Sequence, residues 1–84
     1  MAEIIVRYYA TMRRLTGREE EKITAGAVRG VVSHVRKSYD RRAAKQLEYC
    51  NIFVNNTSVA FLDGLGTRLK DGDTVHVFPP LGGG

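Results

Sequence analysis

The chain has 84 residues, which is enough for one domain with a small core and too short for a second. Hydrophobic residues make up 43% and charged residues 26%, and no apolar run approaches the ~18–20 residues of a membrane span, so a soluble domain is expected. Such a small core leaves little space for an enclosed active site, and the net charge of +4 is compatible with an acidic partner or a nucleic acid.

The chain opens with a predicted strand and a short helical segment. Residues 3–9 are rich in β-branched and aromatic side chains, and their alternation places Ile5, Arg7 and Tyr9 on one face of the strand. Apolar residues three apart then suit a single helical turn, and Gly17 is placed to close it.

An edge strand and the main helix follow. Residues 18–24 predict a strand exposed at an edge, because the run Glu19 to Glu21 is not expected to be buried. Residues 25–39 have the clearest helical period, with Thr24 as a candidate cap, and the presence of Gly30 indicates close packing or a marginal helix. The apolar stripe of this helix comprises Val28, Val31, Val32, Val35 and Tyr39.

The second half of the chain begins with a helical connector over residues 40–48, which is expected on the surface. A short strand is predicted at residues 51–54. Asn55 and Asn56 then suit a tight turn, because asparagine tolerates a positive φ. Residues 57–61 are expected to form the returning strand of this hairpin.

The last predicted strand leads directly into the end of the chain. Residues 71–73, Asp-Gly-Asp, predict a turn before a strand at residues 74–78, and Pro79-Pro80 ends it because proline cannot donate to a ladder. One amphipathic helix and a mixed sheet predict a two-layer α+β domain. Its expected boundaries are residues 1–78 for the domain and 79–84 for an extended tail.

Conventional catalytic and metal-binding patterns are missing from the sequence. His34 lies beside the valine stripe as a boundary residue, and His76 is expected on the surface. Cys50, the single cysteine, excludes an intrachain disulfide and fits a reducing cytoplasm, and no local feature activates its thiol. No metal site is predicted, and the chain is not expected to be an enzyme by itself.

The tail is rich in proline and glycine and has few side chains. Pro79-Pro80 favours an extended conformation, and after Leu81 the residues Gly82 to Gly84 lack any side chain. A terminal carboxylate on such a tail can be joined to AMP by an activating enzyme that uses ATP. Sulfur can then displace AMP and leave a thiocarboxylate. This chemistry requires only an accessible carboxylate, whereas the alternative interpretation is an unused flexible end.

The sequence also resembles a known family. Residues 71–80 read Asp-Gly-Asp-Thr-Val-His-Val-Phe-Pro-Pro before a Gly-Gly end, and this pattern resembles the molybdopterin synthase small subunit in the MoaD/ThiS sulfur-carrier family. Residues 6–10 and 52–55 resemble that family's first and middle strands. One departure is the presence of three glycines after Leu81, where the family commonly has two after a small residue.

The resemblance implies a ubiquitin-like β-grasp fold and a cytoplasmic sulfur carrier without a permanently bound cofactor. Gly84 would carry the adenylate and then the thiocarboxylate, after adenylation by a ubiquitin-activating-type enzyme with ATP. The tail would enter the large subunit of molybdopterin synthase. Expected partner-binding residues are Phe78, Pro79, Pro80, Leu81, Gly82 and Gly83, with Phe53 and His76 as further candidates.

Three alternatives remain open at this point. The carrier could serve thiamin or another sulfur pathway, or Gly84 could join the chain to lysines of target proteins as a ubiquitin-like modifier. A third alternative is an RNA-binding module, whose basic stretch would comprise Arg36, Lys37, Arg41, Arg42 and Lys45. Nucleic acid is not expected, because charge runs are usually solvated faces and no aromatic residues are interleaved to stack bases. A membrane partner is not expected either.

Overall fold

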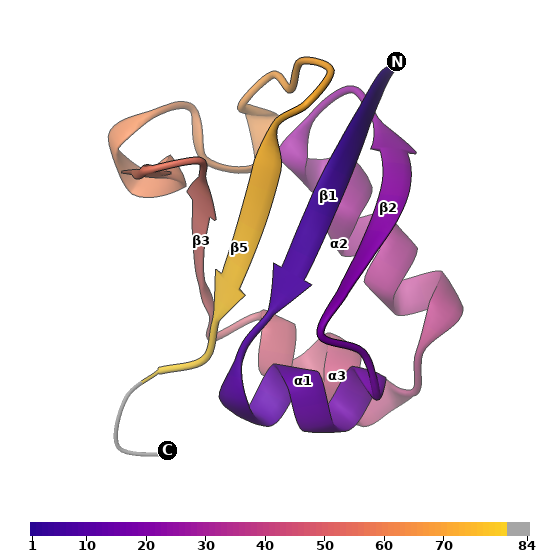
Figure 1. Cartoon of the computed structure of the whole chain (residues 1–84). Helices are drawn as coiled ribbons and strands as arrows, with labels where there is room; N and C mark the ends of the chain where they lie inside the picture. Colours follow the sequence, from indigo (N-terminus) through magenta and orange to yellow (C-terminus); the bar gives the residue numbers. More distant parts are fainter. Residues whose placement is uncertain (81–84) are drawn as a thin grey trace.

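The structure is a computed structural model that describes residues 1–80. One five-stranded mixed sheet carries a main helix across one face, while two shorter helices lie at one end of the sheet (Figure 1). The strands are Ala2–Tyr8 (β1), Glu20–Ala25 (β2), Asn51–Val54 (β3), Thr57–Ser58 (β4) and Thr74–Phe78 (β5). The helices are Ala10–Thr16 (α1), Val28–Ser38 (α2) and Arg41–Leu47 (α3), with 3-10 turns at Val59–Phe61 (η1) and Gly64–Gly66 (η2). Within the described part of the chain, no helix is long and apolar enough to cross a membrane.

The first and last strands form the centre of the sheet. The strand order is β2-β1-β5-β3-β4, with β1 and β5 parallel and the other neighbours antiparallel. Ile5 lies opposite Thr74, and Tyr8 lies opposite Val77. The strand that precedes the tail is therefore an interior strand, held by a neighbour on each side.

The core lies between the sheet and the helices, and strand alternation builds it. The inward residues of β1 and β5 include Val6, Val75 and Val77, whose exposure is 0%. The valine stripe of α2 faces them, as its period predicts. Gly30 lies against the end of β2, where a Cβ on it would be 2.9 Å from the Cβ of Ala25. Of the two explanations offered for this glycine, close packing is the one confirmed.

Three local expectations were wrong. Thr24 does not cap α2, because it lies within β2 and the helix begins after Ala27. The expected strand over residues 57–61 ends at Ser58, whose hydroxyl accepts a hydrogen bond from the Ala60 amide and starts η1. The connector α3 is not purely a surface element, since two of its side chains complete the core. These side chains are Ala43 and Leu47.

The expectation that all three consecutive glutamates are exposed fails at Glu21. Its side chain is only 12% exposed, and its Oε2 accepts hydrogen bonds from Tyr8 at 2.6 Å and Tyr39 at 2.7 Å. The Nε2 of His34 lies 3.0 Å from the same oxygen. Burial acts to raise the pKa of Glu21, but these hydrogen bonds outweigh it and lower the pKa below its usual value. These four residues, called the Glu21 cluster below, connect β1 and β2 to the C-terminal end of α2.

Candidate functional site

Four aromatic rings gather on the face of the sheet opposite the main helix. They belong to Tyr9, Phe53, His76 and Phe78, and this set is called the aromatic face below. Alternation on β5 explains the arrangement: Val75 and Val77 point into the core, so His76 and Phe78 point outward. Pairing of β3 with β5 then places Phe53 opposite His76.

Phe78 is the centre of the aromatic face. Its ring stacks on Tyr9 with centroids 4.3 Å apart and meets Phe53 edge-on at 5.6 Å. All these side chains are half-buried, so each contacts its neighbours while leaving part of its ring accessible. Asn55 and Asn56 join the rings in lining a shallow recess. An aromatic surface with a polar rim is suited to contact with a protein.

His76 contributes to this surface as a neutral ring. Burial and the nearby positive charge of Arg7 lower the pKa of His76, which favours the uncharged imidazole at neutral pH. A hydrogen bond of 2.7 Å joins its Nδ1 to the Tyr9 hydroxyl. His76 thus lies on the surface, as predicted, and its uncharged form is favoured within the aromatic face.

The root of the tail is fixed on both sides. The Tyr9 amide donates to the Val77 carbonyl at 3.3 Å, and Asn51 of β3 pairs with Phe78. Pro79 and Pro80 follow as half-buried residues. The last four predicted site residues lie outside the described residues, so their roles stay predictions, as does the domain boundary after residue 78. They are Leu81, Gly82, Gly83 and Gly84.

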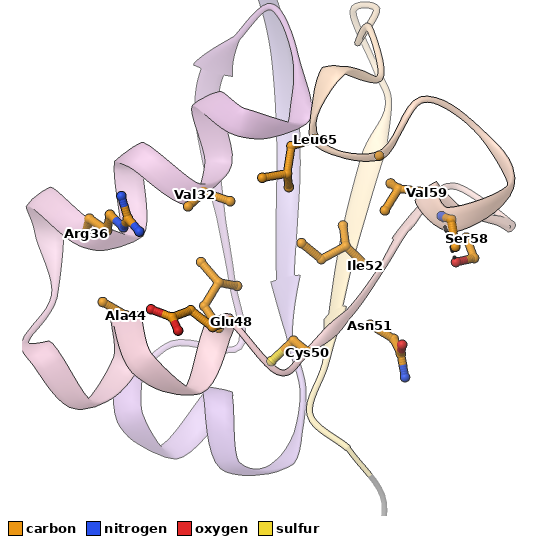
Figure 2. A pocket seen from close by; sticks show the side chains of 13 residues that line it. Val32, Arg36, Ala44, Glu48, Cys50, Asn51, Ile52, Ser58, Val59 and Leu65 are labelled. Atoms are coloured by element: carbon orange, nitrogen blue, oxygen red, sulfur yellow. Dashed lines mark hydrogen bonds between the residues drawn. The ribbon is translucent and has the colours of Figure 1, made fainter.

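A second hollow lies between α2, α3, β3 and the segment that follows β4, with a volume of about 460 Å³. Figure 2 shows apolar side chains pointing into it, among them Val32, Ile52 and Leu65. Cys50 borders this hollow and donates its thiol hydrogen to the Gln46 carbonyl. Burial raises the pKa of the Cys50 thiol to about 11, so the nucleophilic thiolate is scarce at neutral pH. The hollow therefore lacks an activated cysteine.

Tyr9 is the member of the aromatic face that the sequence reasoning did not select. Alternation placed it on the outer face of the first strand. However, its contact with Phe78 depends on the parallel pairing of β1 with β5, which joins residues almost at opposite ends of the chain. The sequence feature that could have identified Tyr9 was an aromatic residue at the end of a predicted strand, next to a predicted helical turn.

A mixed sheet whose interior strand leads into a proline pair and a glycine-rich end defines a ubiquitin-like carrier or modifier protein. The chain belongs to the ThiS family, whose sequence model matches residues 6–84. It is 34% identical over 94 residues to the small archaeal modifier protein 3 of Haloferax volcanii, covering 98% of this chain and 99% of that protein. It is also 29% identical over 83 residues to the sulfur carrier protein CysO of Mycobacterium tuberculosis, covering 87% and 89% respectively.

Solved structures agree with this assignment. The small archaeal modifier protein 1 of Methanosarcina acetivorans superimposes with a TM-score of 0.88 at 28% identity, covering 100% of this chain and 98% of that one. Subunit 1 of the molybdopterin-converting factor from Helicobacter pylori, solved in complex with subunit 2, is likewise similar. Its TM-score is 0.72 at 26% identity, with 98% and 99% coverage. The family resemblance and the β-grasp fold expected from the sequence are both confirmed.

Proposed function

We propose that this chain carries sulfur on Gly84 for the synthesis of molybdopterin. An adenylating enzyme joins the terminal carboxylate to the α-phosphate of ATP and releases pyrophosphate. A sulfur nucleophile supplied by a partner then attacks the acyl carbon, AMP leaves, and a thiocarboxylate remains. The large subunit of molybdopterin synthase takes this sulfur into the dithiolene of the cofactor. The chain itself supplies a docking surface and a reactive end.

One structural observation carries this proposal. Phe78 is both the centre of the aromatic face and the last residue of β5 before the tail. A partner that covers the aromatic face therefore meets the root of the tail in a fixed position. Only the residues beyond Pro80 must then be bound in the active site of that partner. Phe78 therefore belongs both to the proposed docking surface and to the strand that leads into the tail.

The preference for molybdopterin rests on the closing motif and on one relative. Residues 71–80 carry the motif that resembles the molybdopterin synthase small subunit. The similar Helicobacter pylori subunit was solved with its subunit 2, so a protein of this shape does pair with a second subunit in that system. The large subunit is accordingly the partner we assign to the aromatic face.

Thiocarboxylate formation tests the proposal directly. The protein is incubated with the adenylating enzyme of the same organism, ATP, Mg²⁺ and a sulfide source, and its intact mass is measured. A sulfur-for-oxygen shift on the wild type is expected, together with its loss in Gly83→Leu, because a side chain at this position displaces the reacting carbon. A displacement of about 1 Å is sufficient to remove a reactive geometry. Equal thiocarboxylate yields from both proteins would show that the tail is not threaded.

A second function is favoured by the Haloferax relative, which is named as a modifier protein. In that case the adenylated Gly84 would acylate the amino group of a lysine on a target protein, again with the loss of AMP. The two functions share the adenylation step and differ in the nucleophile that follows. Digested cell protein distinguishes them: glycine-branched lysine peptides indicate a modifier, and a thiocarboxylate on the free chain without such peptides indicates a carrier.

A further inference from the structure

The basic side chains of this protein are concentrated at one end of the molecule. Residues 10–18 and 36–50 hold eight of the 13 Lys and Arg residues but only two of the nine Asp and Glu residues. These two segments carry a formal charge of +6. Glu19, Glu20 and Glu21 follow at the same end of the sheet and, together with Arg7 opposite Glu20, bring the formal charge of this end to +4, whereas the charges of the remaining residues sum to zero. The two segments comprise α1, the last turn of α2, and α3 with its flanking residues, and they are called the basic end below.

The basic end lies beside the root of the tail. Figure 1 shows α1 and α3 at the end of the sheet where β1 and β5 finish. Backbone contacts agree with this placement. The Tyr9 amide, just before α1, donates a hydrogen bond to the Val77 carbonyl, and Asn51, which follows α3, pairs with Phe78. α3 also packs against both α1 and α2, so the basic residues of the three helices belong to one group of packed elements.

The length of the tail fixes how near a partner must come. Four residues follow Pro80, and a fully extended chain gains at most about 3.6 Å per residue, so Gly84 reaches no further than about 14 Å from Pro80. Any active site that handles Gly84 must lie within that distance, and the rim of the site must therefore approach the basic end. Charges act over a Debye length of about 8 Å at physiological salt. The charge of that rim consequently affects every productive encounter.

We propose that the basic end is a second contact surface, which matches an acidic rim around the tail-binding channel of the adenylating enzyme. This proposal rests on the proposed function and names a property of the partner. The attraction steers the tail toward the channel of the adenylating enzyme, and it raises the association rate. Several of the cations are available for such contacts. Within residues 1–80, Arg14 and Lys45 are exposed and form no salt bridge.

An acidic protein fits this surface better than RNA does. Single-stranded nucleic acid is bound by basic grooves in which successive aromatic rings stack on the bases. Tyr49 is the aromatic side chain that the basic end leaves most exposed, at 65%. The neighbouring rings are occupied, since Tyr9 stacks on Phe78 and the Tyr39 hydroxyl donates to Glu21. The tail, which under the proposed function enters a protein active site, begins beside this region.

A matched pair of charge reversals tests the proposal. Arg14→Glu with Lys45→Glu changes the charge of the basic end, while Arg29→Glu with Arg68→Glu changes the net charge equally at the other end of the molecule. All four side chains are exposed. The measurement is the association rate with the adenylating enzyme of the same organism, followed by stopped-flow fluorescence at low and at physiological salt. Thermal melts confirm that both variants are folded.

We expect the first pair to slow association by about 10-fold at low salt, within the range that electrostatic steering provides, and the control pair to change it by less than about 2-fold. Wild-type association should also slow as salt rises, a measurement that needs no variant. Equal rates for the two pairs, or an association rate independent of salt, would overturn the proposal. So would RNA binding that persists at physiological salt and is lost only in the first pair. If charge-dependent association is seen but the tail is never adenylated, the proposed function fails and this inference stands.

Discussion

Replacing Glu21 by glutamine keeps the shape of the side chain and removes its negative charge from the Glu21 cluster. In the native protein one carboxylate oxygen accepts hydrogen bonds from two tyrosine hydroxyls and lies beside His34 Nε2, at distances of 2.6, 2.7 and 3.0 Å. Tyr8 is fully buried, whereas Tyr39 and His34 are partly accessible to water. The substitution therefore affects Tyr8 most, because its hydroxyl has no route to solvent.

The expected cost follows from these three contacts. A hydrogen bond to a charged group contributes about 1.5–3 kcal/mol, and one between neutral groups about 0.5–1.5 kcal/mol, so each contact loses roughly 1 kcal/mol. Partial rehydration of Tyr39 and His34 reduces the total, and we expect Glu21→Gln to lower the free energy of unfolding by about 2 kcal/mol. For a domain of this size, that corresponds to a fall in Tm of roughly 10 °C.

The effect should depend on pH with a definite sign. Because the pKa of Glu21 in the folded state lies below its ordinary value of 4.5, its carboxylate contributes stability above about pH 4.5. That contribution is lost as the pH falls through the lower, folded-state pKa. The difference between the wild type and Glu21→Gln should therefore be present at neutral pH and shrink in strong acid.

Urea unfolding at neutral and acidic pH provides the assay, and the neighbouring Glu20→Gln is the control. Glu20 is half-exposed and pairs with Arg7 at 3.3 Å on the surface, so its loss should cost less than about 1 kcal/mol. A Glu21→Gln variant as stable as this control at neutral pH would refute the reasoning. An unchanged stability difference in strong acid would refute the part that concerns charge.

Two further experiments test other parts of the fold. Gly30→Ala should lower the free energy of unfolding by about 1 kcal/mol despite the better helix propensity of alanine, because overpacking against Ala25 costs about 1–3 kcal/mol. Adding Ala25→Gly should restore the lost stability in a thermal melt, and a stabilised single variant would contradict the close contact. Cys50, whose thiol pKa is raised to about 11, should react with iodoacetamide far more slowly in the folded protein than in urea at the same mildly alkaline pH. Equal rates would mean that burial does not protect this thiol.

The periodic parts of the fold could be predicted from the sequence. Alternation identified β1 and β5, and the 3.6-residue period identified α2, because each element buries one regular face. Gly17 was correctly placed at the end of α1, where its φ of 71° favours glycine. These features depend on residues close together in the sequence, so local reasoning finds them.

The features that were missed depend on distant partners. The run of three glutamates indicates charge, but only the antiparallel register with β1 shows that Glu21 faces inward opposite Val6. Its hydroxyl partners lie in β1 and after α2, which no local pattern brings together. The aromatic face has the same origin: Phe53 and His76, both named as partner-binding candidates, lie on it, whereas Tyr9 joins them through the parallel pairing of β1 with β5.

The interior position of β5 also determines how the protein resists being pulled. A force on the tail acts along the axis of β5, whose hydrogen bonds to β1 and β3 lie across that direction on both sides. The bonds are then loaded together in shear, whereas an edge strand pulled sideways would peel from the sheet one bond at a time. Under the proposed function, a partner that pulls the tail along this axis acts against both sets of hydrogen bonds at once.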